Sequence, residues 1–535
     1  MKNRSVRTPL LRSLVRAFRL AHIANQPHSP SASELAAMSQ ENTLSRRSFL
    51  RRTSLASVAL GLGGATTLFS SASCKKDKLN QSRKIIIVGG GMAGLRAAYH
   101  LKKAGWYSTV FEASERTGGR MYSTKNLMGE GYTTELGGEF IDTIHEDMLE
   151  LADEFGFELI DTLAPSELAL TKDLFFFNNQ RYSLTQVIEA FQPIANQITS
   201  DIDSLPDSIT YQDPGTAVSF DNKTISEYLT GIGATGWIKS LIEVAYVSEY
   251  GLEADQQSAI NFLYLFSPDT SNGKFEIYGE SDERYKIKGG NQQIVDKLAD
   301  EVAEQINKGH RLEALRLNTS GDYTLTFNVG GSTVEHTAEF VVMTIPFTLL
   351  REVDFSQAGF SALKTQAINQ LGYGTNAKLM LGVNNRVWRE QGYGGYLFTD
   401  LSMIQGGWDN TQLQTGSGGG YTIYLGGNRG VEVGNGTPES QIQALLPQLE
   451  LAWAGISNSF NNKVGRFHWP SYAYTKGSYA CYKPGQITTF GGAEQETAGN
   501  VFFAGEHCSL DYQGYMNGAA VTGREAAENI LAIID

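Results

Sequence analysis

The chain has 535 residues, a length that allows two or three domains and a large hydrophobic core. Glycine accounts for 57 of these residues, against an average share of about 7%, which suits a protein with many tight turns. The net charge of −13 argues against a nucleic-acid partner and is compatible with cationic ligands or with solubility alone. The three cysteines, Cys74, Cys481 and Cys508, fit neither a disulfide framework nor a zinc site, and no metal site is predicted.

Residues 1–44 are predicted to form a basic, disordered extension. Within them, residues 10–23 combine apolar positions with arginines in the pattern of a basic amphipathic helix. Residues 25–41 are rich in Ser, Pro and Gln and are expected to be disordered. Met38 offers a second start position, so the true start stays open between Met1 and Met38.

A twin-arginine signal peptide is predicted over residues 45–74. Residues 45–50 read SRRSFL, and the uncharged, mildly apolar run that follows contains glycines that disfavour a permanent membrane helix. An uncleaved anchor is the alternative, and cleavage after residues 71–73 or lipidation of Cys74 are both open. We expect export by the twin-arginine machinery to the periplasm or cell envelope. This route carries folded proteins, often with a cofactor already bound.

The stretch that begins at Lys84 carries the strongest local pattern. It predicts a buried strand at residues 84–88 (KIIIV), a glycine turn at 89–94 (GGGMAG), a helix at 95–104 and a second strand at 108–111. Glu112 ends the second strand, 18 residues after Gly94. This order is typical of a dinucleotide-binding βαβ unit, with a purely structural glycine turn as the alternative.

Each residue type in this unit has an expected role. Gly89 allows the tight turn, Gly91 lets the backbone approach a pyrophosphate, and Gly94 lets the helix lie close to the strand. The helix N-terminus offers amide groups and the positive end of its dipole to the phosphates. Glu112 is placed to accept hydrogen bonds from a ribose. The predicted nucleotide contacts here also include Met92, Ala93 and Ala113.

Five further blocks narrow the kind of nucleotide fold. They are residues 115–120 (ERTGGR), 135–142 (ELGGEFID), 284–291 (RYKIKGGN), 501–506 (VFFAGE) and 514–520 (GYMNGAA). Together they resemble the flavin-containing amine oxidase family, which includes monoamine oxidases, polyamine oxidases and L-amino-acid oxidases. The resemblance covers residues 84–535 and implies FAD as the cofactor, whereas the βαβ unit alone does not separate NAD from FAD.

The resemblance implies an α/β fold with two domains, each discontinuous in sequence. A Rossmann-like, glutathione-reductase-like FAD-binding domain would comprise residues 84–150, 284–346 and 493–535. An α+β substrate-binding domain would comprise residues 151–283 and 347–492. Local patterns predict helices at 147–155, over most of 159–283, at 294–306 and at 514–534, and strands at 312–317, 323–329, 332–336, 339–346, 378–383 and 421–425.

The resemblance also assigns cofactor contacts. Gly119 and Arg120 would meet the FAD pyrophosphate. Gly137 and Gly138 would pass close to the isoalloxazine ring, where a side chain would collide. The strand at Leu312 would touch adenine, and the N-terminus of the closing helix would face the flavin. The predicted set is completed by Glu139, Gly505, Glu506 and Met516.

Ser478 indicates how FAD would be attached. It stands where animal monoamine oxidases carry the cysteine that forms a thioether with FAD, and serine cannot form that bond. Cys481 and Cys508 lie in flavin-facing blocks, but small buried side chains are the simpler interpretation for both. FAD is therefore expected to bind non-covalently.

Three residues are predicted to act in catalysis. Lys378 resembles the family lysine that binds flavin N5 through a water, with a solvent-exposed strand-end lysine as the alternative. Tyr479 and Tyr515 resemble the two walls of an aromatic cage that holds a neutral amine with its C–H bond aimed at N5. Core packing is the alternative for both tyrosines. Aligning Tyr479 requires a one-residue gap, which leaves Tyr482 as a second choice.

The sequence does not decide between amines and amino acids as substrates. Some L-amino-acid oxidases carry an arginine that clamps the substrate carboxylate where this chain has Phe140. An arginine elsewhere, Arg284 or Arg389, is the alternative clamp. Glu139 and Asp142 are candidates to attract a substrate ammonium, with backbone capping or solvation as the alternative for both.

The sequence therefore predicts an exported FAD-dependent oxidase of amines. The amine would give hydride to flavin N5, water would hydrolyse the imine, and oxygen would reoxidise the flavin to yield hydrogen peroxide. The alternatives are an L-amino-acid oxidase, a flavin desaturase and a non-catalytic FAD-fold protein. The expected partners are the small-molecule amine or amino acid and oxygen. The oligomeric state stays open, a homodimer included.

Overall fold

The computed structural model describes residues 79–266, 277–278 and 281–534. The predicted extension over residues 1–44, the signal peptide over residues 45–74 and Cys74 lie outside these residues. Within the described ranges, no helix is both long and apolar enough to cross a membrane.

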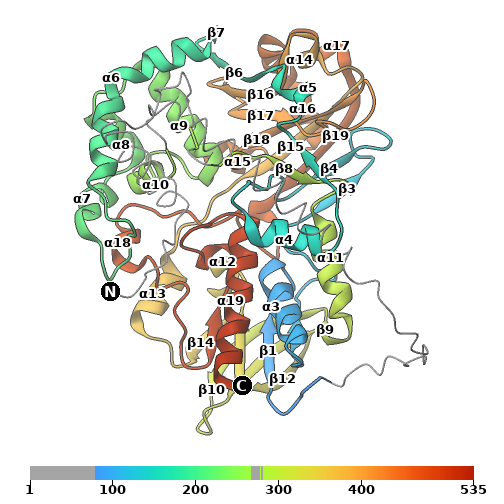
Figure 1. Cartoon of the computed structure of the whole chain (residues 1–535), viewed down its shortest axis with the longest axis vertical. Helices are drawn as coiled ribbons and strands as arrows, with labels where there is room; N and C mark the ends of the chain where they lie inside the picture. Colours follow the sequence, from blue (N-terminus) through green and yellow to red (C-terminus); the bar gives the residue numbers. More distant parts are fainter. Residues whose placement is uncertain (1–78, 267–276, 279–280, 535) are drawn as a thin grey trace, which may run out of the picture. The chain divides into compact units, whose positions relative to one another are not determined.

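A five-stranded parallel sheet contains the predicted βαβ unit (Figure 1). In spatial order it consists of β20 (Val501–Phe503), β13 (Phe340–Met343), β1 (Ile85–Val88), β2 (Thr109–Phe111) and β9 (Ile306–Asn307). Each neighbouring pair is parallel. All four residues of β1 are buried, as expected for a strand covered on both faces. The sheet joins segments from the beginning, middle and end of the described chain.

Helix α3 (Met92–Lys103) connects β1 to β2 and begins three residues before the predicted start at residue 95. Gly94 therefore lies in its first turn, where a Cβ would collide with the carbonyl of Gly89. Glycine disfavours helices, so the local pattern placed the helix after it. In the structure, close packing of the helix against the turn outweighs that preference.

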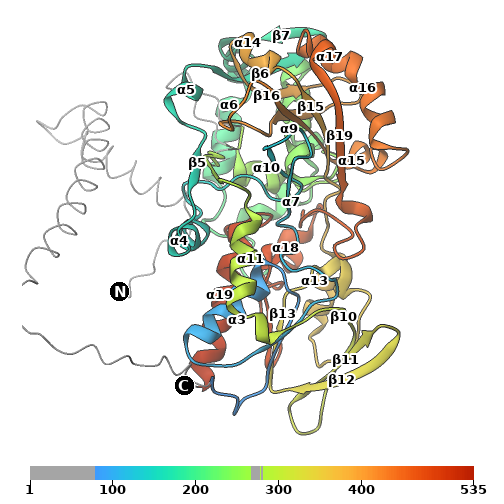
Figure 2. The same ribbon diagram turned by 90° about the vertical axis from the view of Figure 1, so that its right-hand side faces the viewer.

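The closing helix α19 (Met516–Ile534) packs along α3, and the two lie side by side in Figures 1 and 2. At their contact, Gly523 of α19 faces the backbone of Ala93, and a Cβ on Gly523 would collide with it. The absence of a side chain lets the two helix backbones approach each other. This contact positions the N-terminal turn of α3.

A four-stranded sheet holds the strands predicted between residues 312 and 336. Its order is β12 (Ser332–Ala338), β11 (Tyr323–Val329), β10 (His310–Leu317) and β14 (Asp354–Gln357). Figure 2 shows β10, β11 and β12 together beside β13. Strand β14 pairs in parallel with β10. Helix α11 (Gln292–Glu301) ends five residues before the predicted limit of 306, because residues 306–307 form β9.

A seven-stranded sheet lies above the other two in Figure 1. Its order is β19 (Phe460–His468), β15 (Ala377–Val383), β18 (Gly419–Leu425), β17 (Gly406–Asp409), β16 (Tyr393–Thr399), β6 (Thr171–Phe177) and β7 (Gln180–Tyr182). The predicted strands at 378–383 and 421–425 pair antiparallel within it. Two smaller ladders pair β3 (Ser123–Lys125) with β4 (Thr133–Glu135) and β5 (Leu159–Asp161) with β8 (Tyr285–Ile287).

The prediction that residues 159–283 are mostly helical is wrong for their first part, which contains β5, β6 and β7. Residues 174–177 (LFFF) of β6 are all buried, and a short apolar run does not distinguish a strand from a buried helix segment. Strand β6 pairs with β16, more than 200 residues later. That partner, rather than local propensity, determines its conformation.

The other α-helices of the described chain connect the strands of these sheets. They are α4 (Glu146–Glu154), α5 (Pro165–Leu168), α6 (Leu184–Asp203), α7 (Val218–Asp221), α8 (Ile225–Gly231), α9 (Gly236–Tyr250), α10 (Ala259–Leu265), α12 (Phe347–Leu350), α13 (Ala362–Gln370), α14 (Val387–Glu390), α15 (Gly427–Glu432), α16 (Pro438–Ala452), α17 (Ile456–Ser459) and α18 (Gln486–Phe490). Helix α9 packs against β16, β17 and β18. It ends at Gly251, whose φ of 74° is favoured by glycine. This end brings residues 248–250 to the cavity described below.

Replacing Gly523 with alanine should separate α19 from α3. We expect Gly523→Ala to lower the free energy of unfolding by about 1–3 kcal/mol, because the new methyl group overpacks the contact. The matched control is Gly231→Ala in α8, where a Cβ meets nothing within 4 Å. The control should leave the melting midpoint unchanged or slightly raised. Equal midpoints for the two variants would contradict the assigned packing.

Candidate active site

A cavity of about 820 Å³ is lined by residues of all three larger sheets. Its wall contains most of the predicted site residues. The predicted catalytic residues that line it are Lys378, Tyr479 and Tyr515, and the predicted cofactor residues that line it are Gly89, Gly91, Met92, Ala93, Glu112, Ala113, Gly119, Arg120, Gly137, Gly138, Glu139, Leu312, Gly505, Glu506 and Met516. Gly94 is the predicted residue that does not line it. The structure thus gathers these residues into one space, and their individual roles stay predictions.

One end of the cavity has the features of a nucleotide cradle. A Cβ on Gly91 would meet only the Cα of Gly119, at 3.8 Å, so a side chain there would extend into the open space. The first turn of α3 contains no acidic residue, which leaves its positive dipole end uncompensated. Glu112 lines the same end and accepts hydrogen bonds from the Gly90 amide at 2.7 Å and the Ser114 amide at 2.8 Å. These features fit the diphosphate and ribose of a flavin nucleotide.

Arg120 and Glu506 form hydrogen bonds that connect this end of the cavity to the last part of the chain, residues 478–535. Arg120 Nη1 donates to Glu506 Oε1 at 2.8 Å and to the carbonyl of Ser478 at 2.6 Å. Glu506 Oε2 also accepts the Gly514 amide at 3.0 Å. Close by, a Cβ on Gly138 would collide with the side chain of Met516. Segments near residues 120, 138, 478, 506 and 516 therefore meet at one part of the cavity wall.

Glu139 forms a buried ion triad with two lysines. Lys378 Nζ donates to Glu139 Oε2 at 2.7 Å, and Lys286 Nζ lies 3.4 Å from Glu139 Oε1. Lys378 also donates to the carbonyls of Glu135 at 3.0 Å and Gly137 at 2.9 Å. Burial alone would raise the pKa of the Glu139 carboxyl, but Lys378 and Lys286 lower it below its usual value. Glu139 is therefore occupied by two cations of the chain itself.

The two predicted cage tyrosines both bind Glu249. The hydroxyl of Tyr479 donates to the backbone carbonyl of Glu249, and it also lies 2.9 Å from the hydroxyl of Tyr424. The hydroxyl of Tyr515 donates to the carboxylate of Glu249 at 3.3 Å. The ring of Tyr479 packs next to Gly514, the neighbour of Tyr515. Residues from α9 and from the end of the chain thus fix the two rings.

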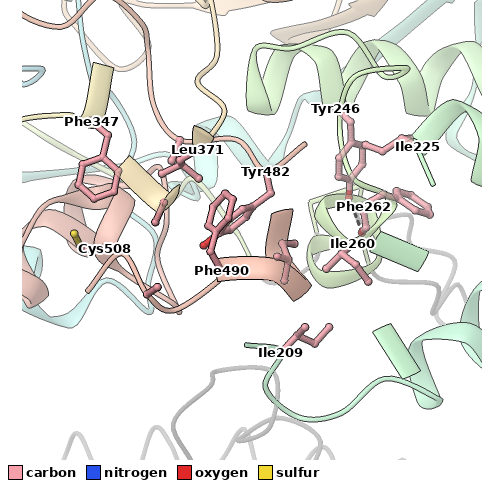
Figure 3. Close-up of a cluster of buried hydrophobic side chains, with 14 of the residues drawn as sticks. Ile209, Ile225, Tyr246, Ile260, Phe262, Phe347, Leu371, Tyr482, Phe490 and Cys508 are labelled. Carbon is pink, nitrogen blue, oxygen red and sulfur yellow. Dashed lines mark hydrogen bonds between the residues drawn. The ribbon is translucent and has the colours of Figure 1, made fainter. Parts of the chain in front are cut away.

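Tyr482, the alternative to Tyr479, does not line the cavity. Its hydroxyl donates to Glu494 Oε1 at 3.0 Å, and its ring lies in the hydrophobic core near Phe490 (Figure 3). Cys508 belongs to the same core, and Cys481 is fully buried. Burial raises the pKa of both thiols well above the usual value. Neither thiol lines the cavity.

Neither of the two arginines considered as substrate clamps lines the cavity. Arg284 pairs with Asp161 at 2.8 Å, and Arg389 pairs with Glu167 at 2.8 Å. Phe140 does line the cavity, with its ring 5.7 Å from that of Trp408. The wall at this position is therefore aromatic.

Among the acidic residues of the cavity wall that sequence reasoning missed are Glu249 and Glu283. Burial raises the pKa of Glu249 to about 7 and that of Glu283 to about 8, and repulsion from Asp142 adds to both shifts. Asp142 accepts the Glu283 amide at 3.0 Å, a capping contact. The available signal for Glu249 is its place in the last turn of α9, where the helix dipole disfavours a carboxylate.

An L-amino acid dehydrogenase from Synechocystis sp. is 26% identical over 468 residues, which are 84% of this chain and 95% of that protein. The flavin-containing amine oxidase B of Mus musculus is 24% identical over 481 residues, 85% of this chain and 87% of that protein. The structure of cyclohexylamine oxidase from Brevibacterium oxydans matches with a TM-score of 0.72 and 21% identity, over 84% of this chain and 99% of that chain. At this identity, the structural likeness concerns the fold.

A family sequence model described as flavin-containing amine oxidoreductase matches residues 92–531. This range contains Glu139, Lys378, Tyr479 and Tyr515, and it covers most of the described chain. Membership implies a flavin cofactor and an oxidoreductase activity. The mixed α/β sheets described above agree with this assignment. The chain belongs to the flavin-containing amine oxidoreductase family.

Proposed function

We propose that this protein is an FAD-dependent amine oxidase. The observation that carries the proposal is that Lys378, Tyr479 and Tyr515 line the same cavity as the glycine cradle around Gly91. When bound, FAD supplies a two-electron acceptor that takes a hydride from the carbon beside the amine nitrogen and passes the electrons to oxygen, giving hydrogen peroxide. Water then hydrolyses the imine to an aldehyde and ammonia.

The residues of the chain divide into binding and reacting groups. The N-terminus of α3 and Glu112 would hold the pyrophosphate and the ribose. Tyr479 and Tyr515 would hold the neutral amine, with their hydroxyls fixed on Glu249 so that the rings keep one orientation. Lys378, held by three acceptors, would place a fixed positive charge where negative charge accumulates during reoxidation.

Non-covalent FAD is part of this proposal. Ser478 lines the cavity and donates to Asn376 Oδ1 at 2.7 Å. A serine hydroxyl cannot form the thioether that would link FAD to the chain. The buried positions of Cys481 and Cys508 away from the cavity support the same conclusion.

Oxidation of L-amino acids is the second candidate, because one relative is named an L-amino acid dehydrogenase. A carboxylated substrate needs a cationic clamp, and arginine is the usual choice. Arg284 and Arg389 are held by Asp161 and Glu167 away from the cavity. The carboxyl groups of Glu249 and Glu283 would repel a substrate carboxylate when ionised. We therefore favour amines.

We also propose the two domains and the cellular location that the sequence predicts. The parallel sheet around β1 supports a Rossmann-like, glutathione-reductase-like FAD domain built from residues 84–150, 284–346 and 493–535. Residues 151–283 and 347–492 would form the substrate domain. The SRRSFL motif supports export by the twin-arginine machinery to the periplasm or cell envelope, with lipidation at Cys74 still open. Oxygen as the acceptor and the assembly state belong to the same proposal.

The purified protein should be yellow and should release peroxide with amines. We expect a flavin absorption spectrum, loss of its visible band when an amine is added without oxygen, and peroxide when oxygen returns. Amines and L-amino acids are tested side by side by peroxide release. Peroxide from amino acids alone would replace our first choice with the second. A protein without flavin absorption would contradict both.

Lys378→Met should separate the two halves of the reaction. We expect reoxidation of the reduced flavin by oxygen to slow by about 100-fold, as when a fixed charge-stabilising group is removed. Anaerobic reduction by the amine should change much less. Stopped-flow absorbance measures the two steps separately.

Lys364→Met is the matched control for that variant. Lys364 is also a buried lysine, but it donates to the carbonyl of Glu494 at 2.9 Å and does not line the cavity. Its loss should lower stability without slowing reoxidation. Normal reoxidation in Lys378→Met would remove Lys378 from the mechanism.

A further inference from the structure

Three carboxyl groups gather at the end of the cavity near α9. Asp142, Glu249 and Glu283 all line this end, which we call the acidic end. The described arginines that line the cavity are Arg116, Arg120 and Arg311, and they belong to segments of the nucleotide end. The described lysines that line the cavity are Lys378, bound to Glu139, and Lys476, paired with Glu352. The acidic end therefore has more anionic than cationic groups on its own wall.

Glu249 is the most directly placed of the three carboxyl groups. Its backbone carbonyl receives the hydroxyl of Tyr479, and its carboxylate receives the hydroxyl of Tyr515. Tyr515 is the one hydrogen-bond partner that the described residues give this carboxylate. The charge thus lies beside the pair of tyrosines and retains capacity for a further donor.

An unpaired hydroxyl lies next to Glu249. Ser248 lines the cavity, its residue is 7% exposed, and its Oγ has no hydrogen-bond partner among the described residues. Leaving a buried polar group unpaired costs about 1–3 kcal/mol. A ligand with several N–H donors would satisfy this hydroxyl and the carboxylate together. Within the described residues, no cluster of His, Cys, Asp and Glu has the arrangement of a metal site.

Aromatic side chains form the wall next to the acidic end. Tyr278, Tyr396, Phe398, Trp408 and Tyr424 all line the cavity there. Their faces suit a chain of methylene groups. Lys172 and Lys378 of the chain itself already lie over the rings of Tyr396 and Trp408, so the other rings are the ones that can attract a further cation. The combination of an apolar wall and an anionic end matches a flexible aliphatic chain that carries a positive charge.

We infer that Glu249, with Glu283 and Asp142, binds a second cationic group of the substrate, so that the preferred substrates are aliphatic diamines. This inference rests on the proposed amine oxidation at the same cavity. One amine of the substrate lies at the two tyrosines and reacts. The other stays charged as an ammonium and donates to the Glu249 carboxylate and to Ser248 Oγ.

The acidity of these groups sets the pH dependence. Burial raises the pKa of Glu249 to about 7, and repulsion from Asp142 adds to the shift, while Tyr515 opposes it. Burial raises the pKa of Glu283 to about 8, with Lys172 opposing and Asp142 and Glu249 adding. A carboxyl group with a raised pKa ionises only as the pH rises through that value. Binding of an ammonium therefore becomes stronger between about pH 6 and pH 8.

The test compares 1,4-diaminobutane with butylamine on the FAD-loaded enzyme. For the wild type, kcat/KM should be higher for the diamine, and the ratio of the two values should rise from about pH 6 to pH 8. Glu249→Gln should lower kcat/KM for the diamine by about 10- to 100-fold, the usual effect of losing a charged hydrogen bond. The value for butylamine should fall by a smaller factor, because the substitution affects this substrate only through the tyrosines, and the ratio should lose most of its pH dependence.

Glutamine is chosen because it keeps the contacts to the tyrosines. Its side-chain oxygen still accepts from Tyr515, and its backbone carbonyl still accepts from Tyr479. The matched control is Glu243→Gln on the same helix, where the carboxylate accepts from Ser226 at 2.7 Å and does not line the cavity. This control should retain the preference and its pH dependence. If Glu249→Gln fails to fold, Glu283→Gln tests the same preference.

The outcomes separate the inference from the proposed function. An equal loss for diamine and monoamine in Glu249→Gln, or a wild type that prefers butylamine, would overturn the inference and leave amine oxidation standing. Absence of anaerobic flavin reduction by either amine would instead contradict the proposed function. Loss of preference in Glu249→Gln with retention in Glu243→Gln supports the inference.

Discussion

The buried carboxylate of Glu139 is the interaction on which the site depends. It bridges Lys286, from β8, and Lys378, from β15, at distances of 3.4 and 2.7 Å. Removing one partner of a buried ion pair costs roughly 3–5 kcal/mol, because the remaining charge is left uncompensated. The three segments are therefore expected to assemble together. The triad joins the loop after β4 to the seven-stranded sheet and fixes the wall of the cavity between them.

Because of this triad, we expect Glu139 not to bind the substrate ammonium. Each of its two carboxylate oxygens accepts a hydrogen bond from one of the two lysines. Two lysines therefore lie near Gly137, although the protein as a whole carries a charge of −13. The carboxyl groups available to a ligand lie instead on α9 and at residue 283. The cavity thus has Lys378 at one part of its wall and a group of carboxyl groups at another.

The sequence predicted best what local patterns determine. The β1–α3–β2 unit depends on one apolar run and three glycines that are close in sequence, and the structure contains it. The start of α3 was misplaced because Gly94 lowers helix propensity, whereas its effect on packing is visible only in three dimensions. Strand β6 was missed because its partner β16 is more than 200 residues away.

The cavity wall also contains some residues that the sequence could indicate and others that only contacts between distant segments reveal. The resemblance selected Lys378, Tyr479 and Tyr515, and the structure places all three at one cavity. It left Tyr479 and Tyr482 open, and only packing separates them. In the sequence, Glu249 is marked only by its place near the end of a helix, and no local pattern marks Ser248. Their importance arises from contacts with residues 479 and 515, far along the chain.

The two parts of the cavity match the direction of electron flow in the proposed reaction. As hydride leaves the substrate, positive charge develops on its nitrogen, and negative charge develops on the acceptor. Fixed charges that are already in place stabilise both changes without reorganisation. Carboxyl groups on the side of the tyrosines favour the first change, and the lysine pair at Glu139 favours the second. Because burial keeps these groups out of bulk water, their effect is stronger than it would be at the surface.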